Sequence, residues 1–466
     1  MFKKLMIKVF CSLLVLGTLP SCTSQNKSIP AYLNPELSFE ERAADLVSRL
    51  TLEEKVAQMD RDAPAIEHLG VHAFNYQGEA LHGIAEAAGG KYMPATSFPQ
   101  SIAMGSTWDP DLMLRVATAI SDEGRAFYNM GEMDISFWSP NINMLRDPRW
   151  GRNDEAYSED PYLMSRIAVA FVKGLQGDHP VYLKTIASPK HFVANNSEFN
   201  RHDGNSEVSE RWLREYYFPS FKACFHEGGA FATMCAYNRV NGVPACGNDW
   251  LLNRVLRDEW GFKGYVVSDC GAISDIYENH KYVLTAEEAS ALAVRSGCDL
   301  NCGYVYEDAL LNAVKQGLVT EEELDVSVQR LFLARYKLGM FADPEEIPYT
   351  TLGPDVVESE ENRELALESA RKSIILLKND GNTLPISGEV KKLAVIGPNA
   401  DNVVLGGYSG KPTRRISVLR GLKEIMGDNM EILHERGCNI TTPDKIYFNP
   451  DMVVGFKGPK EELEEL

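Results

Sequence analysis

Between about residues 60 and 340, short apolar stretches alternate with longer segments of helical periodicity, and this alternation limits the fold more than any other feature. Short apolar stretches without strict in-out alternation are typical of a parallel sheet buried on both faces. The pattern therefore predicts an α/β fold. Its length suits a (β/α)8 barrel of the TIM type, with a doubly wound sheet as the alternative. The candidate strands are Ile135–Trp138, Tyr182–Ala187, Phe231–Ala236 and Tyr265–Val267.

Helix starts are marked by capping boxes, in which Ser or Thr is followed three residues later by Glu. Each one precedes a run whose apolar residues recur with a spacing near 3.6. The pairs are Ser38 with Glu41, Thr51 with Glu54, Thr285 with Glu288, and Thr320 with Glu323.

Polar residues follow the predicted strands in order, and the carboxyl ends of the strands are where an α/β barrel carries its active site. A single polar residue there would mean little, because loops are polar anyway, but a series predicts a site. The series is Asn141, then Lys190 and His191, then Tyr237 and Asn238, then Asp269.

A polar, Pro-containing connector near residues 340 to 360 separates a second unit. We expect a barrel domain over 37–345, a linker over 346–370, and a second α/β domain, present only in part, over 371–466. The second domain should hold a helix over Glu358–Ser373 and buried strands at Ile374–Leu377 and Leu393–Pro398. One further strand candidate lies in the stretch that begins at Met430, and an acidic tail follows at 461–465.

The first 22 residues predict an export signal, since lysines precede an apolar run too short to span a bilayer. The run ends in Leu19-Pro20-Ser21-Cys22, which resembles the lipobox of bacterial lipoproteins. We therefore expect a lipid anchor at Cys22 on a periplasm-facing membrane surface, followed by a tether over 23–36. The alternative is an ordinary signal peptide that contains Cys22 by chance.

The net charge of −19 disfavours a nucleic-acid or anionic-membrane binder and fits an uncharged substrate better. Nine cysteines are too few and too scattered for a disulfide scaffold, and the spacing of Cys298 and Cys302 is only half of a zinc site. We expect neither a metal nor a cofactor, and the oligomeric state is left open.

Five blocks along the chain resemble motifs of glycoside hydrolase family 3, in the order of that family. The resemblance covers nearly all of the chain beyond the signal segment. The blocks are Gly78–Gly83; Asn143–Arg152 with Glu159–Pro161; Lys190–Phe192 continuing to Arg201; Met234–Asn238; and Gly264–Asp269.

The resemblance implies that Asp269 is the nucleophile of a retaining mechanism, which forms a covalent glycosyl-enzyme intermediate. A helix N-cap is the alternative role for an Asp at a strand-to-helix turn. The family positions that line the terminal sugar subsite are matched by Glu79, Arg152, Lys190, His191, Arg201 and Tyr237. We expect three cations near Asp269 to keep it ionised.

All of these subsite residues except Glu79 also have a structural alternative. For Arg152 the alternative is a salt bridge with Glu155 or Asp160, and for Arg201 one with Glu198, which would only stabilise the fold. For Lys190 and His191 the alternative is a structural pair at the end of the barrel whose hydrogen bonds are satisfied. For Tyr237 it is core packing, with the hydroxyl bonded to backbone.

Two departures from the common family pattern indicate the substrate. Gly78–Gly83 replaces an Asp-Gly-Pro segment, and Cys270 replaces a Trp after the nucleophile. Both variants resemble the branch rich in β-xylosidases and α-arabinofuranosidases. We therefore expect an exo-acting β-glycosidase that releases terminal β-xylosyl residues from xylo-oligosaccharides, with a β-glucosidase as the alternative.

The general acid/base is the unassigned part of this prediction. In the family it is a Glu from a loop late in the second domain, and we expect this chain to end before that loop. A second alternative is therefore a sugar-binding remnant without turnover. A family 3 N-acetylglucosaminidase is disfavoured, because that branch has Lys-His-Phe-Pro-Gly where this chain continues with Val193-Ala194.

Overall fold

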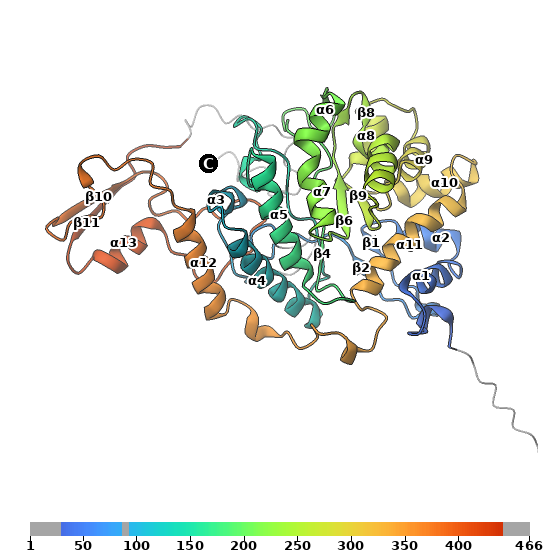
Figure 1. Ribbon diagram of the computed structural model, residues 1–466, viewed down its shortest axis with the longest axis horizontal. Helices are drawn as coiled ribbons and strands as arrows, with labels where there is room; N and C mark the ends of the chain where they lie inside the picture. The colour runs from blue at the N-terminus through green and yellow to red at the C-terminus, as the bar shows by residue number, and fades with distance from the viewer. Residues whose placement is uncertain (1–28, 86–92, 441–466) are drawn as a thin grey trace, which may run out of the picture.

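The computed structural model describes residues 29–85 and 93–440 (Figure 1). The predicted signal segment, Cys22 and the acidic tail lie outside the described residues. Part of the predicted tether is described, and it is not free. Tyr32 is buried, its N–H donates to Asp45, and its hydroxyl donates to the Leu69 carbonyl. The expectation of a tether as far as residue 36 is therefore wrong, because burial of the Tyr32 ring fixes this stretch on the domain.

Helices begin where the capping boxes predict. All four boxes are confirmed, with both reciprocal hydrogen bonds present at the first turns of α1, α2, α9 and α11. The α-helices are α1 (Phe39–Val47), α2 (Leu52–Gln58), α3 (Ser101–Ser106), α4 (Pro110–Asn129), α5 (Pro161–Gln176), α6 (Glu210–Trp212), α7 (Phe218–His226), α8 (Ala272–Glu278), α9 (Ala286–Ser296), α10 (Leu311–Lys315), α11 (Glu321–Lys337), α12 (Glu360–Ser373) and α13 (Val418–Met426). Shorter π-helical segments are Leu213–Tyr217, Trp250–Glu259 and Tyr306–Leu310.

A buried strand forms in each of the four predicted stretches, but β3 and β4 are shorter than predicted, and β4 covers only Ile186–Ala187 of the stretch predicted from Tyr182. Two parallel strand pairs lie in the core of the first domain: β3 pairs with β4, and β6 pairs with β9. The strands are β1 (Asp62–Ala63), β2 (Phe74–Asn75), β3 (Ser136–Phe137), β4 (Ile186–Ala187), β5 (Asn205–Ser206), β6 (Ala232–Cys235), β7 (Arg239–Val240), β8 (Val243–Pro244), β9 (Tyr265–Ser268), β10 (Lys392–Ile396) and β11 (Glu431–Glu435).

Backbone hydrogen bonds link these pairs into a continuous series of segments. Phe192 after β4 donates to Met234 in β6, and Ser268 in β9 donates to Leu300. The series returns to its start, since Asn301 donates to the Met59 carbonyl. From there, Tyr76 donates to Arg61, and Trp138 after β3 donates to Gly78. Within this series only β1 and β2 pair antiparallel. The carboxyl ends of the parallel strands therefore open at one end of the domain.

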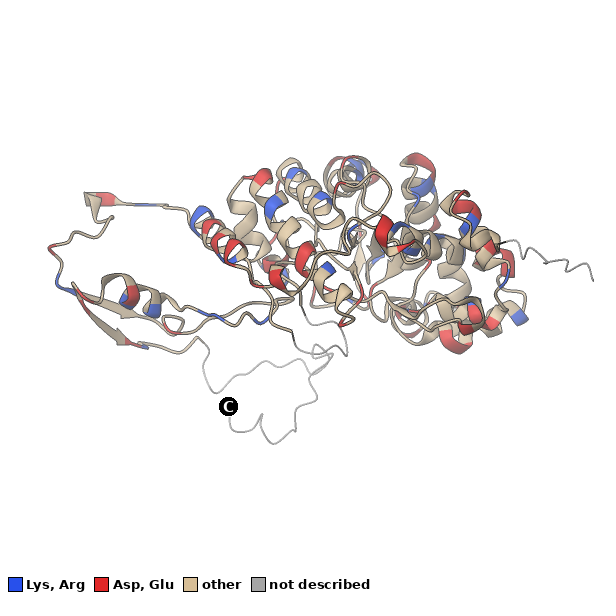
Figure 2. Ribbon diagram, turned by 90° about the horizontal axis from the view of Figure 1, so that it is seen from below, with Lys and Arg blue, Asp and Glu red and all other residues tan. Residues whose placement is uncertain are grey.

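The second part of the chain attaches to the first through α12. Glu368 and Lys372 on α12 form ion pairs with Arg115 and Asp109 of α4 and its cap. Below them, the buried Glu123 carboxylate accepts the N–H of Glu358. The parallel pair of β10 and β11, covered by α13, lies apart from the first domain in both views (Figures 1 and 2). Charged residues occur on the outer helices of both parts (Figure 2).

The prediction of a buried strand at Ile374–Leu377 is wrong. These residues form no strand, and between 55 % and 91 % of each is exposed. The strand predicted at Leu393–Pro398 forms as β10, but its residues are exposed or half-buried. An apolar run is buried only when a neighbouring layer covers it, and no described residues bury Ile374–Leu377 in this way.

Candidate functional site

The site is built around Asp269, which follows the buried strand β9 directly. The Asp269 N–H donates to the Cys235 carbonyl on the neighbouring strand β6 at 3.1 Å, so its backbone continues the sheet. The chain then turns at Gly271, whose φ of +86° is easily adopted only by glycine, and α8 begins. This turn directs the Asp269 side chain to the carboxyl end of the strands.

The two carboxylate oxygens of Asp269 have different surroundings. Oδ1 accepts the N–H of Cys270 at 2.8 Å. Oδ2 is buried and has no hydrogen-bond partner among the described residues. A buried carboxylate oxygen without a donor is unusual, because its desolvation is uncompensated. It is available to bond to another molecule.

Lys190 and His191 follow β4, as the sequence predicts. The Lys190 ammonium is buried and lies 2.5 Å from Oε1 of Glu79, and Ser139 donates to Oε2 of Glu79. Burial lowers the pKa of Lys190 and the Glu79 carboxylate raises it, with a net rise. Lys190 is therefore a fixed cation at this edge of the sheet.

His191 lies beside the nucleophile, with Nε2 3.4 Å from Oδ2 of Asp269. Burial and the cations Arg152, Lys190 and Arg201 hold its pKa well below the usual range, so the ring is neutral.

Asn143 determines which ring nitrogen of His191 carries the proton. Oδ1 of Asn143 accepts the His191 N–H and lies 2.9 Å from Nδ1, while Nδ2 of Asn143 donates to the His191 carbonyl. Nδ1 therefore carries the proton, and Nε2 presents a lone pair to the site.

Arg152 and Arg201 both form the salt bridges that were predicted as the structural alternative to lining the sugar subsite. Arg152 makes a two-fold pair with the buried Glu155, at 2.8 and 2.6 Å, and Arg201 donates to Glu198 at 2.6 Å. Both arginines nevertheless act electrostatically on the Asp269 carboxylate. The salt bridges thus fix two cations beside the nucleophile.

Tyr237 also combines its two predicted roles. Its hydroxyl donates to the Cys270 carbonyl at 2.8 Å, the backbone bond expected of a core tyrosine. The same hydroxyl accepts a hydrogen bond from Nη2 of Arg201 at 3.1 Å. Tyr237 therefore joins the nucleophile turn to the arginine.

The prediction that cations set the ionisation of Asp269 needs a correction. Burial is the largest effect and raises the pKa of Asp269, whereas Arg152, Arg201 and Lys190 act in the opposite direction. The net change is a rise. The three cations are in place, but they only limit the rise in the pKa of Asp269 that burial causes.

This shift predicts the pH dependence of any reaction that needs the ionised Asp269. Because the pKa lies above the ordinary Asp value of 3.8, protonation removes the nucleophile at a higher pH than for an exposed Asp. We expect the rate of covalent labelling by an activated 2-fluoro glycoside to fall on acidification with a midpoint above 3.8. A midpoint at or below that value would contradict the assignment.

Two structural features of the site escaped the sequence analysis. Tyr408, from a loop between β10 and α13, places its ring 4.5 Å from the Lys190 ammonium. Its loop is held to the first domain, since His82 bonds the Gly407 carbonyl and Ser409 bonds Ser97. Nothing near Tyr408 in the sequence distinguishes it from other loop tyrosines.

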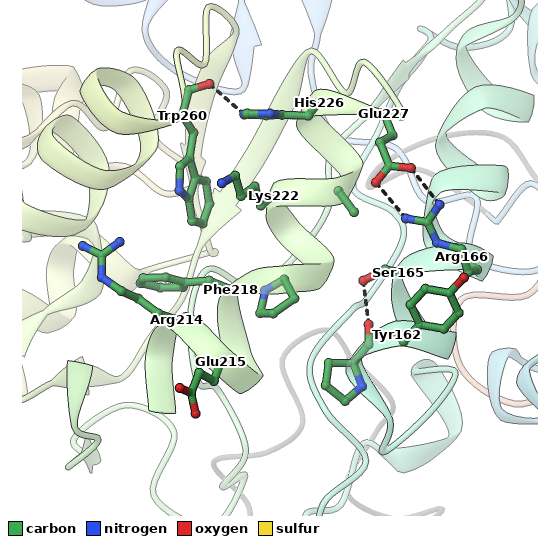
Figure 3. A pocket seen from close by; sticks show the side chains of 13 residues that line it. Tyr162, Ser165, Arg166, Arg214, Glu215, Phe218, Lys222, His226, Glu227 and Trp260 are labelled. Atoms are coloured by element: carbon green, nitrogen blue, oxygen red, sulfur yellow. Dashed lines mark hydrogen bonds and ion pairs between the residues drawn. The ribbon is translucent and has the colours of Figure 1, made fainter. Parts of the chain in front are cut away.

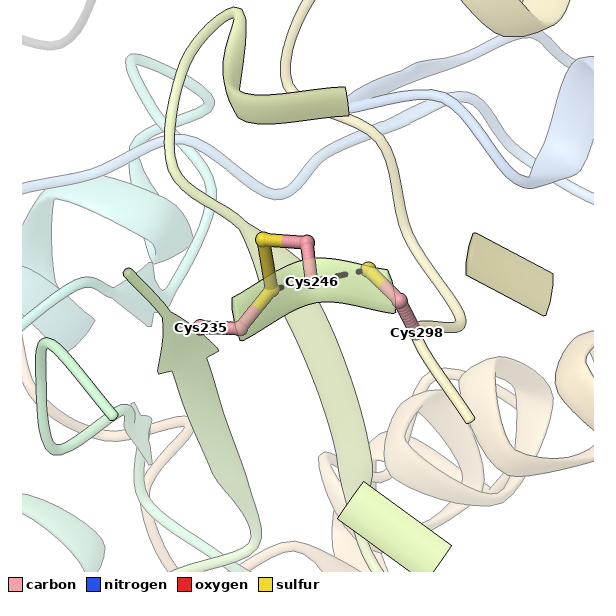
Figure 4. A group of neighbouring side chains, drawn as sticks. All are labelled: Cys235, Cys246 and Cys298. Carbon is pink, nitrogen blue, oxygen red and sulfur yellow. Dashed lines mark hydrogen bonds between the residues drawn. A yellow bond between two sulfur atoms is a disulfide. The ribbon is translucent and has the colours of Figure 1, made fainter. Parts of the chain in front are cut away.

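The second feature is a disulfide between Cys270, next to the nucleophile, and Cys302. A second disulfide joins Cys235 to Cys246, with the free Cys298 sulfur 3.7 Å from that of Cys235 (Figure 4). Three sulfurs lie together there, but two of them share a bond and offer no thiolate to a metal. Four of the nine cysteines thus form two bridges, which their spacing did not reveal because pairing depends on proximity in the fold.

A hollow of about 610 Å³ lies between α5 and α7, lined among others by Tyr162, Phe218 and Trp260 (Figure 3). None of the predicted site residues lines it. Its arginine Arg166 is paired with Glu227. The unpartnered carboxylate oxygen therefore places the candidate site at Asp269 rather than here.

Two family models match the chain. The glycosyl hydrolase family 3 N-terminal domain matches residues 51–334, and the C-terminal domain of that family matches residues 374–465.

Among similar curated proteins, a xylan 1,4-beta-xylosidase of Xylanibacter ruminicola is 40% identical over 92% of this chain and 51% of its own length. A probable exo-1,4-beta-xylosidase of Neosartorya fischeri is 43% identical over 86% of this chain and 54% of its own. The chain thus spans about half the length of the curated relatives it matches.

Similar solved structures include a GH3 exo-beta-xylosidase in complex with a xylobiose aziridine probe, with a TM-score of 0.84 and 34% identity over 89% of this chain and 55% of that one. A beta-glucosidase from Listeria innocua in complex with glucose has a TM-score of 0.72 and 28% identity, over 87% of this chain and 61% of that one.

Proposed function

Because this chain belongs to glycosyl hydrolase family 3, we propose that it is the nucleophile-bearing part of an exo-acting, retaining β-glycosidase specific for terminal β-xylosyl residues. The observation that carries the proposal is the free Oδ2 of Asp269, buried among Arg152, Arg201 and Lys190. A sugar offers hydroxyl groups and an anomeric carbon, and the site has charged groups for the hydroxyls and a free carboxylate oxygen for the carbon. Fixed charges bond hydroxyls strongly, and the unpartnered oxygen is placed to attack carbon.

The reaction follows from these positions. Oδ2 of Asp269 attacks the anomeric carbon, the bond to the leaving oxygen breaks, and a glycosyl ester forms on Asp269. Water then attacks the same carbon, and the ester bond breaks to release the sugar and regenerate the carboxylate. We assign no described residue as the general acid/base that donates a proton to the leaving group and later takes one from water.

The other side chains hold the sugar. Lys190 and the free N–H groups of Arg152 and Arg201 donate to its hydroxyl oxygens, and the bare Nε2 of His191 accepts from a hydroxyl. Tyr408 covers the ammonium of Lys190 and closes this side of the subsite. Glu79 is the counter-ion that keeps Lys190 in place.

Selectivity for the sugar is the first test. Xylose differs from glucose by a missing hydroxymethyl group, which is worth about 10- to 200-fold in discrimination. We expect 2-deoxy-2-fluoro-β-xylosyl fluoride to label the protein at least tenfold faster than its glucosyl counterpart. Faster glucosyl labelling would favour the β-glucosidase alternative, which the similarity to the Listeria innocua enzyme supports.

We also infer a (β/α)8-type barrel for the first domain rather than a doubly wound sheet. The hydrogen-bonded series of segments that returns from Asn301 to Met59 supports a closed sheet, with the β1–β2 pair as a local reversal. The gap between the two family matches supports a domain division within residues 346–370.

Export and lipid anchoring at Cys22 remain part of the proposal. The two disulfides support it, since such bonds persist in oxidising compartments. In the described part of the chain, no helix has the length and apolar character needed to cross a bilayer.

A further inference from the structure

His202 connects Arg201 of the sugar subsite to the helix that follows the nucleophile. Nε of Arg201 donates to Nε2 of His202 at 3.2 Å. The other ring nitrogen, Nδ1, lies 2.9 Å from Oδ2 of Asp275 on α8. The His202 ring also packs edge-on against Tyr237, with centroids 4.8 Å apart. The imidazole is thus held on three sides, although 39% of it is exposed.

The chemistry of the partners fixes the proton on this ring. Nε of Arg201 can only donate, so Nε2 of His202 must be a bare acceptor. The Asp275 carboxylate can only accept, so Nδ1 carries the proton and donates to it. This tautomer is the only one that satisfies both neighbours.

Asp275 is itself anchored to the nucleophile turn. It is buried in α8, its N–H donates to the Gly271 carbonyl, and Asn279 donates to its Oδ1. Gly271 lies two residues after Asp269. A single rigid turn therefore places the nucleophile and, through Asp275 and His202, sets the direction of the Arg201 guanidinium.

We propose that His202 is a positioning residue for the glycosylation step, which orients Arg201 through the Asp275–His202–Arg201 series of hydrogen bonds. This inference rests on the proposed function of the same site. Glu198 and Tyr237 accept hydrogen bonds only from the two terminal nitrogens of Arg201, and the centre of the Tyr237 ring also lies 4.4 Å from the guanidinium carbon. The bond to His202 adds a third hydrogen bond, on the Nε side that neither Glu198 nor Tyr237 bonds, and so narrows the range of guanidinium orientations.

Two substitutions separate the hydrogen bond from the packing. His202→Phe keeps a ring against Tyr237 but removes the acceptor for Arg201. His202→Gln removes the ring but supplies a carbonyl oxygen near the place of Nε2. We expect His202→Phe to slow labelling by the activated 2-fluoro xyloside about 10- to 100-fold, because small misplacements of a positioning group cost this much. His202→Gln should recover to within about threefold of the wild type.

The decisive measurement is a double-mutant cycle with Arg201→Lys, which cannot form the same bond to His202. If His202 acts through Arg201, His202→Phe should change the labelling rate little in the Arg201→Lys background. Independent, multiplicative losses would overturn the proposal, as would a His202→Gln rate as low as that of His202→Phe. Thermal unfolding midpoints of all variants show whether the fold is intact.

His68→Phe is the matched control, because His68 also faces a carboxylate, that of Glu54, away from these residues. It should label like the wild type. If the wild type itself fails to label, the proposed function fails instead, and xylose affinity by calorimetry then tests the same cycle. Equal xylose affinity in wild type and His202→Phe would overturn the positioning role there.

Discussion

Replacing Asp269 by alanine is expected to lower the rate of dinitrophenolate release from 2,4-dinitrophenyl β-xyloside by about 10⁴-fold or more. The leaving group of this substrate needs no proton, so ester formation on Asp269 depends on the nucleophile and not on a general acid. The wild-type carboxylate attacks from a fixed strand end with its Oδ2 free, and alanine has no group to replace it. Release is followed by absorbance in the pre-steady-state phase, before hydrolysis of the glycosyl ester limits turnover.

Azide provides the chemical control for this variant. It is small enough to occupy the space left by the carboxylate, and we expect it to restore release and give an α-xylosyl azide of inverted configuration. The exposed Asp111 on α4 supplies the matched variant, Asp111→Ala, which should keep the full rate. An Asp269→Ala rate within tenfold of the wild type would refute the assigned role.

The second large effect concerns stability rather than chemistry. Glu155→Gln should lower the free energy of unfolding by about 3 kcal/mol or more, because it leaves the buried Arg152 guanidinium without its counter-charge. Only 9% of the Arg152 side chain and 10% of the Glu155 side chain are exposed. Denaturant unfolding curves of the variant and wild type give the difference.

The control pair has the same chemistry in a different environment. Arg166 and Glu227 also form a two-fold ion pair, but 32% and 49% of these side chains are exposed. Water solvates both partners there, so Glu227→Gln should cost less than about 1 kcal/mol. Equal losses for the two substitutions would show that burial does not set the energetics of the Arg152 pair.

Local features of the fold were predictable from sequence, and features that depend on a distant neighbour were not. The capping boxes at Ser38 and Thr320 need only residues three positions apart, so their helices begin as predicted. Ile374–Leu377 has the same apolar character as β9. However, β9 pairs with β6 on one side and bonds to the segment at Leu300 on the other, whereas Ile374–Leu377 has no cover among described residues. A sequence pattern shows which residues are hydrophobic, whereas burial also requires a neighbouring layer that covers them.

The site shows the same division. Asp269, Lys190 and His191 follow predicted strands, and parallel strands bring their carboxyl ends together, so their proximity was predictable. The position of Tyr408 was not, because it arises from a loop of the second domain held by His82 and other residues far away in sequence. The sign of the Asp269 pKa shift depends on burial, which the sequence does not show.

The most direct test of the account is peptide mapping of the protein after reaction with 2-deoxy-2-fluoro-β-xylosyl fluoride. The fluorine slows hydrolysis of the glycosyl ester, so the adduct survives proteolysis and its position can be read by tandem mass spectrometry. We predict one fluoroxylosyl group per chain, on Asp269. An adduct on another carboxylate, or none at all in a protein that still binds xylose, would contradict the assignment of Asp269 as the nucleophile.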